Sequence, residues 1–115
     1  LRARNQSIAP AHVRRAEQFI QEFAAQEINL DMVVEASKVP KRTLYDSFKR
    51  FRGISPMCYL RSVRLSKTRE ELKSTTNTKS VTEVALYWHF SHLGRFSMQY
   101  KKRFGELPSE TAKVV

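Results

Sequence analysis

The sequence predicts an all-α fold of seven helices, arranged as two helix-turn-helix subdomains joined by a long linker helix. Apolar residues recur at helical spacing through most of the chain, and no long stretch shows the period-two alternation that is typical of strands. The segment FSMQYKKRFGELP, residues 96–108, also repeats in kind the segment LYDSFKRFRGISP, residues 44–56. Two such segments in register indicate a duplicated module.

The first subdomain is predicted at residues 10–54. The polar, basic stretch before it, residues 1–9, is expected to be a linker or a disordered N-terminus. Pro10 suits the first turn of a helix that carries an apolar face to about Gln26. Because the sequence starts with Leu1 rather than Met, we expect it to be a piece of a longer protein.

Two helices joined by a tight turn are predicted next. Asn29 offers an N-cap to a short helix at residues 30–37. The turn at residues 38–40 ends it, because the residue before a proline resists the helical conformation. The next helix, residues 41–53, has one apolar stripe, and Gly53 suits the left-handed residue that ends a helix. Helix, tight turn and helix is the order of a helix-turn-helix unit.

The linker helix is predicted at residues 55–73, where Ser55 and Pro56 form an N-cap and first-turn pair. A helix of about eighteen residues is roughly 27 Å long. That length suits two recognition helices about one DNA turn apart, with roughly 34 to 36 Å between half-sites. Its basic residues, expected on an exposed side, are Arg61, Arg64, Lys67 and Arg69.

The second subdomain is predicted at residues 74–115. A polar loop leads to a helix that begins at Ser80, and Glu83 three residues later completes a capping box. A turn and a further helix, at about residues 94–104, follow, and Pro108 starts a short last helix.

The charge of the chain indicates a polyanionic partner. The net charge is +10 and the pI about 10.2, and the basic residues crowd both repeats. A merely solvated surface is the alternative, but it does not explain this clustering. No apolar run is long enough for a membrane span, and no secretory signal pattern is present. The single cysteine, Cys58, excludes an internal disulfide and a multi-cysteine zinc site, and indicates a reducing compartment.

Catalysis finds no support in the sequence. The three histidines, His12, His89 and His92, have no acidic or cysteine partner at ligand or triad spacing. No glycine-rich phosphate loop is present. We therefore expect no enzyme activity, no cofactor and no metal site.

A set of residues in both halves carries a family resemblance. In the first half they are the stretch RTLYDSF, then Gly53, Ser55, Pro56, Tyr59, Leu60, Arg64, Leu65 and Leu72. In the second half they are Val84, Ala85, Phe90, Phe96, Lys101, Phe104, Gly105, Pro108, Ser109 and Glu110. Over about residues 11–112 the chain resembles the C-terminal DNA-binding domain of the AraC/XylS family of bacterial transcription regulators. The resemblance implies that the third and sixth helices enter successive major-groove segments.

Four positions depart from the family pattern. Lys38 and His89 stand where a turn glycine is usual. A non-glycine residue at positive φ costs about 1 kcal/mol, so these turns are expected to be rebuilt rather than strained. Pro40 replaces the usual serine cap of the third helix. Met98 replaces a common arginine, which favours an apolar contact, such as one with a thymine methyl, over a polar one.

Base contacts are expected from the third and sixth helices. Arg42, Tyr45 and Asp46 lie opposite the apolar stripe of the third helix. Arginine binds guanine through two hydrogen bonds, and aspartate accepts one from cytosine. For Asp46 the alternative is an ion pair with Arg42 or Arg50 at helical spacing. The candidates in the sixth helix are Leu93, Gly94, Arg95, Ser97 and Met98.

Phosphate contacts position a protein on DNA without carrying sequence information. The candidates are Lys41, Thr43, Lys49, Arg50, His92, Lys101 and Lys102. A helix cap is the alternative role for His92, and a solvated position is the alternative for each lysine.

The aromatic residues recur at helical spacing, which favours a core over a base-stacking set. Cys58 is expected to be buried helix packing.

These observations predict sequence-specific binding of double-stranded DNA by a module of a bacterial transcription regulator. The alternative is a basic helical adaptor that docks on an acidic protein such as RNA polymerase, and a non-specific RNA binder comes third. The resemblance implies an effector-sensing and dimerisation domain outside this chain. A cytoplasmic, nucleoid-associated location is expected.

Overall fold

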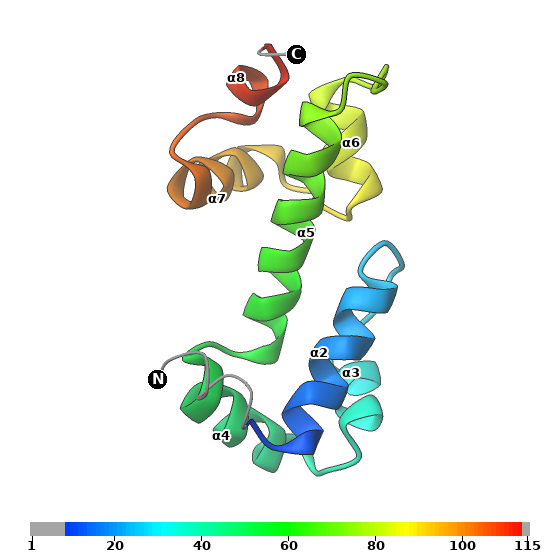
Figure 1. Cartoon of the computed structure of the whole chain (residues 1–115), viewed down its shortest axis with the longest axis vertical. Coiled ribbons are helices and arrows are strands. Elements are labelled where there is room, and N and C mark those ends of the chain that lie inside the picture. Colours follow the sequence, from blue (N-terminus) through cyan, green and yellow to red (C-terminus); the bar gives the residue numbers. More distant parts are fainter. Residues whose placement is uncertain (1–8, 114–115) are drawn as a thin grey trace. The chain divides into compact units, whose positions relative to one another are not determined.

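The computed structural model describes residues 9–113, and this part of the chain is all-α (Figure 1). It contains seven helices and no strand, as predicted. In chain order they are α2 (Ala11–Phe23), α3 (Leu30–Ser37), α4 (Lys41–Arg52), α5 (Pro56–Lys73), α6 (Val81–Tyr87), α7 (Leu93–Phe104) and α8 (Pro108–Lys113). The predicted N-terminal linker lies outside the described residues except for Ala9, which is buried.

The chain divides into two compact units, and their boundary lies between Val63 and Arg64, inside helix α5. In the first unit α2 contacts α3 and α4, which also contact each other. In the second unit α6, α7 and α8 contact one another. The buried residues of the first unit include Val13, Ala16, Ile20, Val33, Leu44, Phe48 and Leu60. The core of the second unit consists of Leu65, Leu72, Val84, Ala85, Phe96 and Tyr100.

The predicted helix caps are confirmed. The Asn29 side chain accepts the backbone N–H of Met32 at 2.9 Å. At the start of α6 the Ser80 hydroxyl accepts the backbone N–H of Glu83 at 3.1 Å, and the Glu83 carboxylate accepts that of Ser80 at 2.9 Å. The hydrogen bond from the Ser80 backbone lowers the pKa of Glu83. These side chains satisfy N–H groups that a helix start leaves without an intrahelical partner.

Helix α2 is shorter than predicted. Pro10 is its N-cap rather than its first residue, and the helix ends at Phe23 instead of near Gln26. Ala24 is buried just beyond the last helical residue, and the next residues form a turn. The apolar pattern therefore continued past the helix, because buried turn residues carry the same signal as helical ones.

The turns before the two recognition-helix candidates keep a left-handed residue, so the expectation that they would be rebuilt is wrong. Lys38 has a φ of 67° and His89 a φ of 70°. The backbone N–H of Lys38 donates to the carbonyl of Glu35 at 3.2 Å and closes the end of α3. Both turns thus hold a non-glycine residue in the conformation that glycine adopts most easily, and each carries the corresponding backbone strain.

Replacement of Lys38 by glycine is expected to raise the free energy of unfolding by up to about 1 kcal/mol, because it relieves the left-handed strain. Urea denaturation followed by circular dichroism measures the change. Lys38→Ala is the matched control, since it removes the same charged side chain but keeps a Cβ. Equal stability of the glycine and alanine variants would contradict the interpretation.

The repeat seen in the sequence is also a repeat in structure. Helix α7 starts at residue 93, which is 52 positions after α4 starts at residue 41, and both helices have twelve residues. Each ends at a left-handed glycine, Gly53 with a φ of 74° and Gly105 with a φ of 80°. Positions on the two helices can therefore be compared one by one.

Candidate nucleic-acid interface

Helix α4 has a buried side and an exposed side. Leu44 and Phe48 are fully buried, whereas Arg42, Tyr45 and Asp46 are exposed. The side chains of Arg42 and Asp46 are 93% and 76% exposed, and Arg42 Nε lies 4.0 Å from Asp46 Oδ2. Such an exposed ion pair contributes little to stability. The three side chains expected to contact bases are therefore together on one accessible surface.

The phosphate-contact candidates of α4 lie around the same surface. Lys41, Thr43, Lys49 and Arg50 are all exposed. The guanidinium carbon of Arg50 lies 5.6 Å from the centroid of the Phe51 ring, a cation–π contact. Lys49 and Arg50 belong to the last turn, where the helix dipole favours positive charge.

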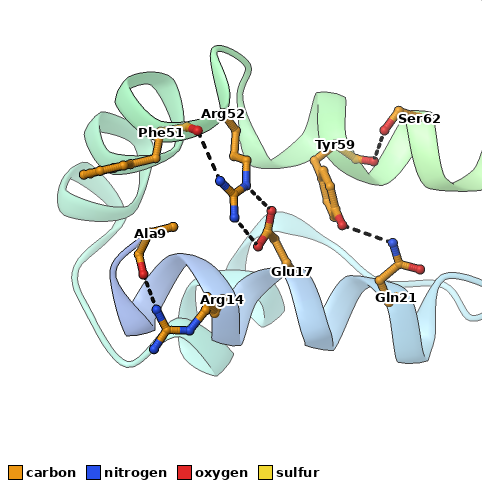
Figure 2. A network of polar contacts seen from close by, with 8 residues as sticks. All are labelled: Ala9, Arg14, Glu17, Gln21, Phe51, Arg52, Tyr59 and Ser62. Atoms are coloured by element: carbon orange, nitrogen blue, oxygen red, sulfur yellow. Dashed lines mark hydrogen bonds and ion pairs between the residues drawn. The ribbon is translucent and has the colours of Figure 1, made fainter. Parts of the chain in front are cut away.

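An ion pair ties the C-terminal end of α4 to α2 (Figure 2). Arg52 donates from Nε to one Glu17 oxygen at 2.5 Å and from Nη2 to the other at 3.1 Å. Both side chains are 16% exposed. The hydrogen bond with Glu17 raises the pKa of Arg52. Arg52 also donates to the carbonyl of Phe51 at 3.2 Å, and beside this pair Gln21 donates to the Tyr59 hydroxyl at 3.0 Å.

Two further contacts fix α2 against the helix-turn-helix pair. Arg15 donates from Nη2 and Nε to the carbonyl of Ser37, at 2.8 and 3.1 Å, and so holds the end of α3. His12 Nε2 lies 2.7 Å from the hydroxyl of Ser47, in the middle of α4. Neither contact was predictable from the sequence, because partners 22 and 35 residues apart leave no local spacing signal.

Helix α7 begins at a histidine cap. His92 Nδ1 accepts the backbone N–H of Arg95 at 3.2 Å, so the capping alternative for His92 is realised in the free chain. Gly94 and Arg95 are exposed, and Met98 is 75% exposed. Phe96 and Tyr100 are buried on the other side of the helix.

The remaining α7 candidates differ in exposure. Leu93 is 37% exposed and Ser97 is half-buried, which makes them less accessible than Met98. Lys101 and Lys102, the phosphate candidates, are exposed in the last turn.

The expected exposed basic side of α5 is only partly present. Arg61 is exposed, but Arg64, Lys67 and Arg69 are half-buried, so the expectation is wrong for these three. Burial lowers the pKa of Arg64. The guanidinium carbon of Arg69 lies 5.1 Å from the centroid of the Phe104 ring. Long basic side chains pack their aliphatic stems on apolar surface, and helical spacing alone does not show this.

The aromatic residues pack in the core or at its edge, as the helical spacing in the sequence predicted. Phe48, Phe96 and Tyr100 are buried, and Phe51, Trp88 and Phe104 are half-buried. Cys58 is half-buried rather than buried, which corrects the expectation for it. A hydrogen bond with the Ser55 side chain lowers the pKa of the Cys58 thiol.

Among residues 9–113 no three side chains gather as metal ligands, and no helix has the length and apolar composition of a membrane span.

Comparisons with known proteins place these two units in a family. A model of a helix-turn-helix domain matches residues 33–113. Over 101 residues the chain is 44% identical to the XylDLEGF operon transcriptional activator 2 of Pseudomonas putida. A probable AraC family transcriptional regulator from Rhodopseudomonas palustris has the same fold, with a TM-score of 0.86 and 33% identity over 90% of this chain and 96% of that one. The chain belongs to the AraC/XylS family. It is a helix-turn-helix DNA-binding domain of a family of transcription regulators, not an enzyme.

Relatives of this AraC/XylS domain are longer than the chain itself. The match to the activator 2 covers 87% of this chain and 64% of that protein. The match to the XylDLEGF operon transcriptional activator of P. putida has 39% identity and covers 86% of this chain but 31% of that protein. The structure of the xylose-binding transcription activator XylR aligns with a TM-score of 0.79 and 27% identity over 94% of this chain and 28% of that one.

Proposed function

We propose that this AraC/XylS domain binds an asymmetric, bipartite duplex DNA site of roughly two helical turns, with α4 and α7 in successive major-groove segments. The repeated helix supports the proposal most directly. Two twelve-residue helices each bury one apolar side and expose a basic and polar one. Duplication of a recognition element suits a target with two half-sites.

The proposed roles follow exposure and chemistry. Base contacts come from Arg42, Tyr45 and Asp46 on α4, and from Leu93, Gly94, Arg95, Ser97 and Met98 on α7. Phosphate contacts come from Lys41, Thr43, Lys49, Arg50, His92, Lys101 and Lys102. In this assignment His92 keeps its cap to Arg95, which uses Nδ1 and leaves Nε2 to face a phosphate.

Selection from a random duplex pool tests the proposal. We expect a two-part motif, because two helices with different exposed residues contribute one part each. Titration of the selected duplex at several salt concentrations is expected to give a slope of log affinity against log salt of about −5 to −7, as six to eight neutralised phosphates require. Equal binding of all duplexes would overturn sequence-specific recognition.

Arg42→Ala is expected to weaken binding by about 1 to 3 kcal/mol and to relax the motif at one base pair, because a two-hydrogen-bond contact to guanine is lost. Lys49→Ala, one of the phosphate candidates on the same helix, is the matched control. It should weaken all duplexes alike and reduce the salt slope by about one. Identical effects of the two substitutions would contradict the assigned roles.

The relatives' greater length supports a further part of the proposal, in which an effector-sensing and dimerisation domain lies elsewhere in the full-length protein. We also propose the adaptor function, in which this domain docks on RNA polymerase as part of an activator. Leu86 and Tyr87 on α6, which are 53% and 50% exposed and lie outside both recognition helices, favour that second function. Leu86→Ala tests it: the variant should still bind the selected duplex but should no longer recruit RNA polymerase to it.

Cytoplasmic localisation follows from the DNA target.

A further inference from the structure

The two recognition helices differ at the same pair of positions. The pair on α4 is Arg42 and Asp46, and the equivalent pair on α7, 52 residues later, is Gly94 and Met98. Residues four apart on a helix are neighbours on one face. The face of α4 therefore presents two opposite charges 4.0 Å apart. The equivalent face of α7 presents the backbone of Gly94 beside the thioether of Met98.

Gly94 has no reason within the chain to be a glycine. It lies in the first turn of a regular helix, and its φ is outside the left-handed region. A Cβ built on it meets only the His92 ring, at 3.8 and 4.0 Å, which is ordinary contact. At a position whose conformation suits both residues, a glycine loses more conformational entropy on folding than an alanine and is the less stable choice. The missing side chain therefore points to close approach by something outside the chain.

Met98 is the most exposed large apolar side chain of the described residues, at 75%. Basic residues surround it, since Arg95 and Lys101 lie three positions away and Lys102 four. An apolar group within a cationic surface complements a polyanion that also carries an apolar group. The C5-methyl of thymine is that group in the major groove.

Resting on the proposed function, we infer that the Gly94–Met98 face of α7 recognises thymine through its methyl group, with Gly94 allowing the backbone to approach the base. The face of α4 then selects its half-site by polar contacts, and the face of α7 selects its half-site by an apolar one. This assigns Met98 as a specificity-determining residue of the second half-site, beside the polar contacts proposed for Arg95 and Ser97.

Uracil scanning of the selected duplex tests the inference, because uracil differs from thymine only by the missing methyl. Replacing the thymines one at a time should weaken binding about 3- to 10-fold at one or two positions of a single half-site. Met98→Ala should bind the thymine and uracil duplexes equally. Met98→Leu, which keeps an apolar side chain, should restore the preference.

Met32→Ala is the matched control, because it shortens another exposed methionine side chain, on α3 and outside the recognition helices. It should keep the full preference for thymine. A preference that survives Met98→Ala would overturn the assignment of Met98.

Gly94→Ala separates stability from binding. Its midpoint of thermal unfolding should rise by about 2 to 6 °C, because alanine fits the helix and restricts the unfolded chain. Its affinity for the selected duplex should fall by about tenfold or more, because the methyl group blocks the approach. Unchanged affinity would overturn the role of Gly94.

The outcomes also separate this inference from the proposed function. A selected two-part motif that is insensitive to uracil at every thymine would overturn the thymine-methyl contact and leave sequence-specific binding intact. Selection that yields no motif would remove the proposed function itself, and the inference with it.

Discussion

Tyr100→Ala is expected to lower the free energy of unfolding by about 3 to 5 kcal/mol, since it removes a fully buried aromatic ring and leaves a cavity. The ring centroid of Tyr100 lies 4.7 Å from that of Phe104 and 5.8 Å from that of Phe96. Its hydroxyl donates to Thr111 on α8 at 2.7 Å. Urea denaturation measures the loss, and amide hydrogen exchange should show it first in the second unit.

Tyr100→Phe is the control for the ring itself. It removes the hydroxyl, with its hydrogen bond to Thr111 and its interaction with Arg69, and should cost about 1 kcal/mol. A loss as large as that of the alanine variant would contradict the assignment of the stability to ring packing.

The buried hydroxyl of Tyr100 should also make the stability of the fold depend on pH. Burial raises the pKa of Tyr100 above its ordinary value of 10.0. A raised pKa in the folded state means that the neutral phenol stabilises the fold below pH 10 and that this contribution is lost as the pH rises through the folded pKa. The difference in unfolding free energy between the native protein and Tyr100→Phe should therefore shrink at alkaline pH.

Arg52→Ala is expected to lower the free energy of unfolding by about 2 to 3 kcal/mol. It leaves the Glu17 carboxylate, which is 16% exposed, without its two hydrogen bonds from the guanidinium. Because the pair joins α2 to the end of α4, the substitution should also weaken recognition of the first half-site. Chemical denaturation and binding to the selected duplex measure the two effects.

A double-mutant cycle gives the control for this ion pair. Glu17→Leu combined with Arg52→Met should be less destabilising than the sum of the two single substitutions, because no buried charge is then left without a partner. Arg52→Lys should recover only part of the stability, since a lysine cannot form both hydrogen bonds in one plane. Strict additivity of the single effects would contradict a direct interaction.

The helices themselves were predictable from the sequence. Asn29, Ser80 and Gly53 set helix ends through contacts with residues at most five positions away. The repeat of α4 in α7, and the exposure of Arg42 and Met98 opposite buried residues, follow from helical periodicity. Such features depend on neighbours within one or two turns, so a single sequence contains them.

Tertiary structure decided what depends on distant partners. Nothing near Arg52 indicates that it pairs with Glu17, 35 residues away, instead of facing a phosphate. The half-burial of Arg64 and Arg69 depends on the surface on which their stems lie. The sequence favoured a rebuilt turn at Lys38, whereas in the structure α3 packs against α4 and Lys38 keeps the left-handed conformation. Local chemistry determined which faces are apolar and which are basic; packing between helices determined which charged side chains stay exposed.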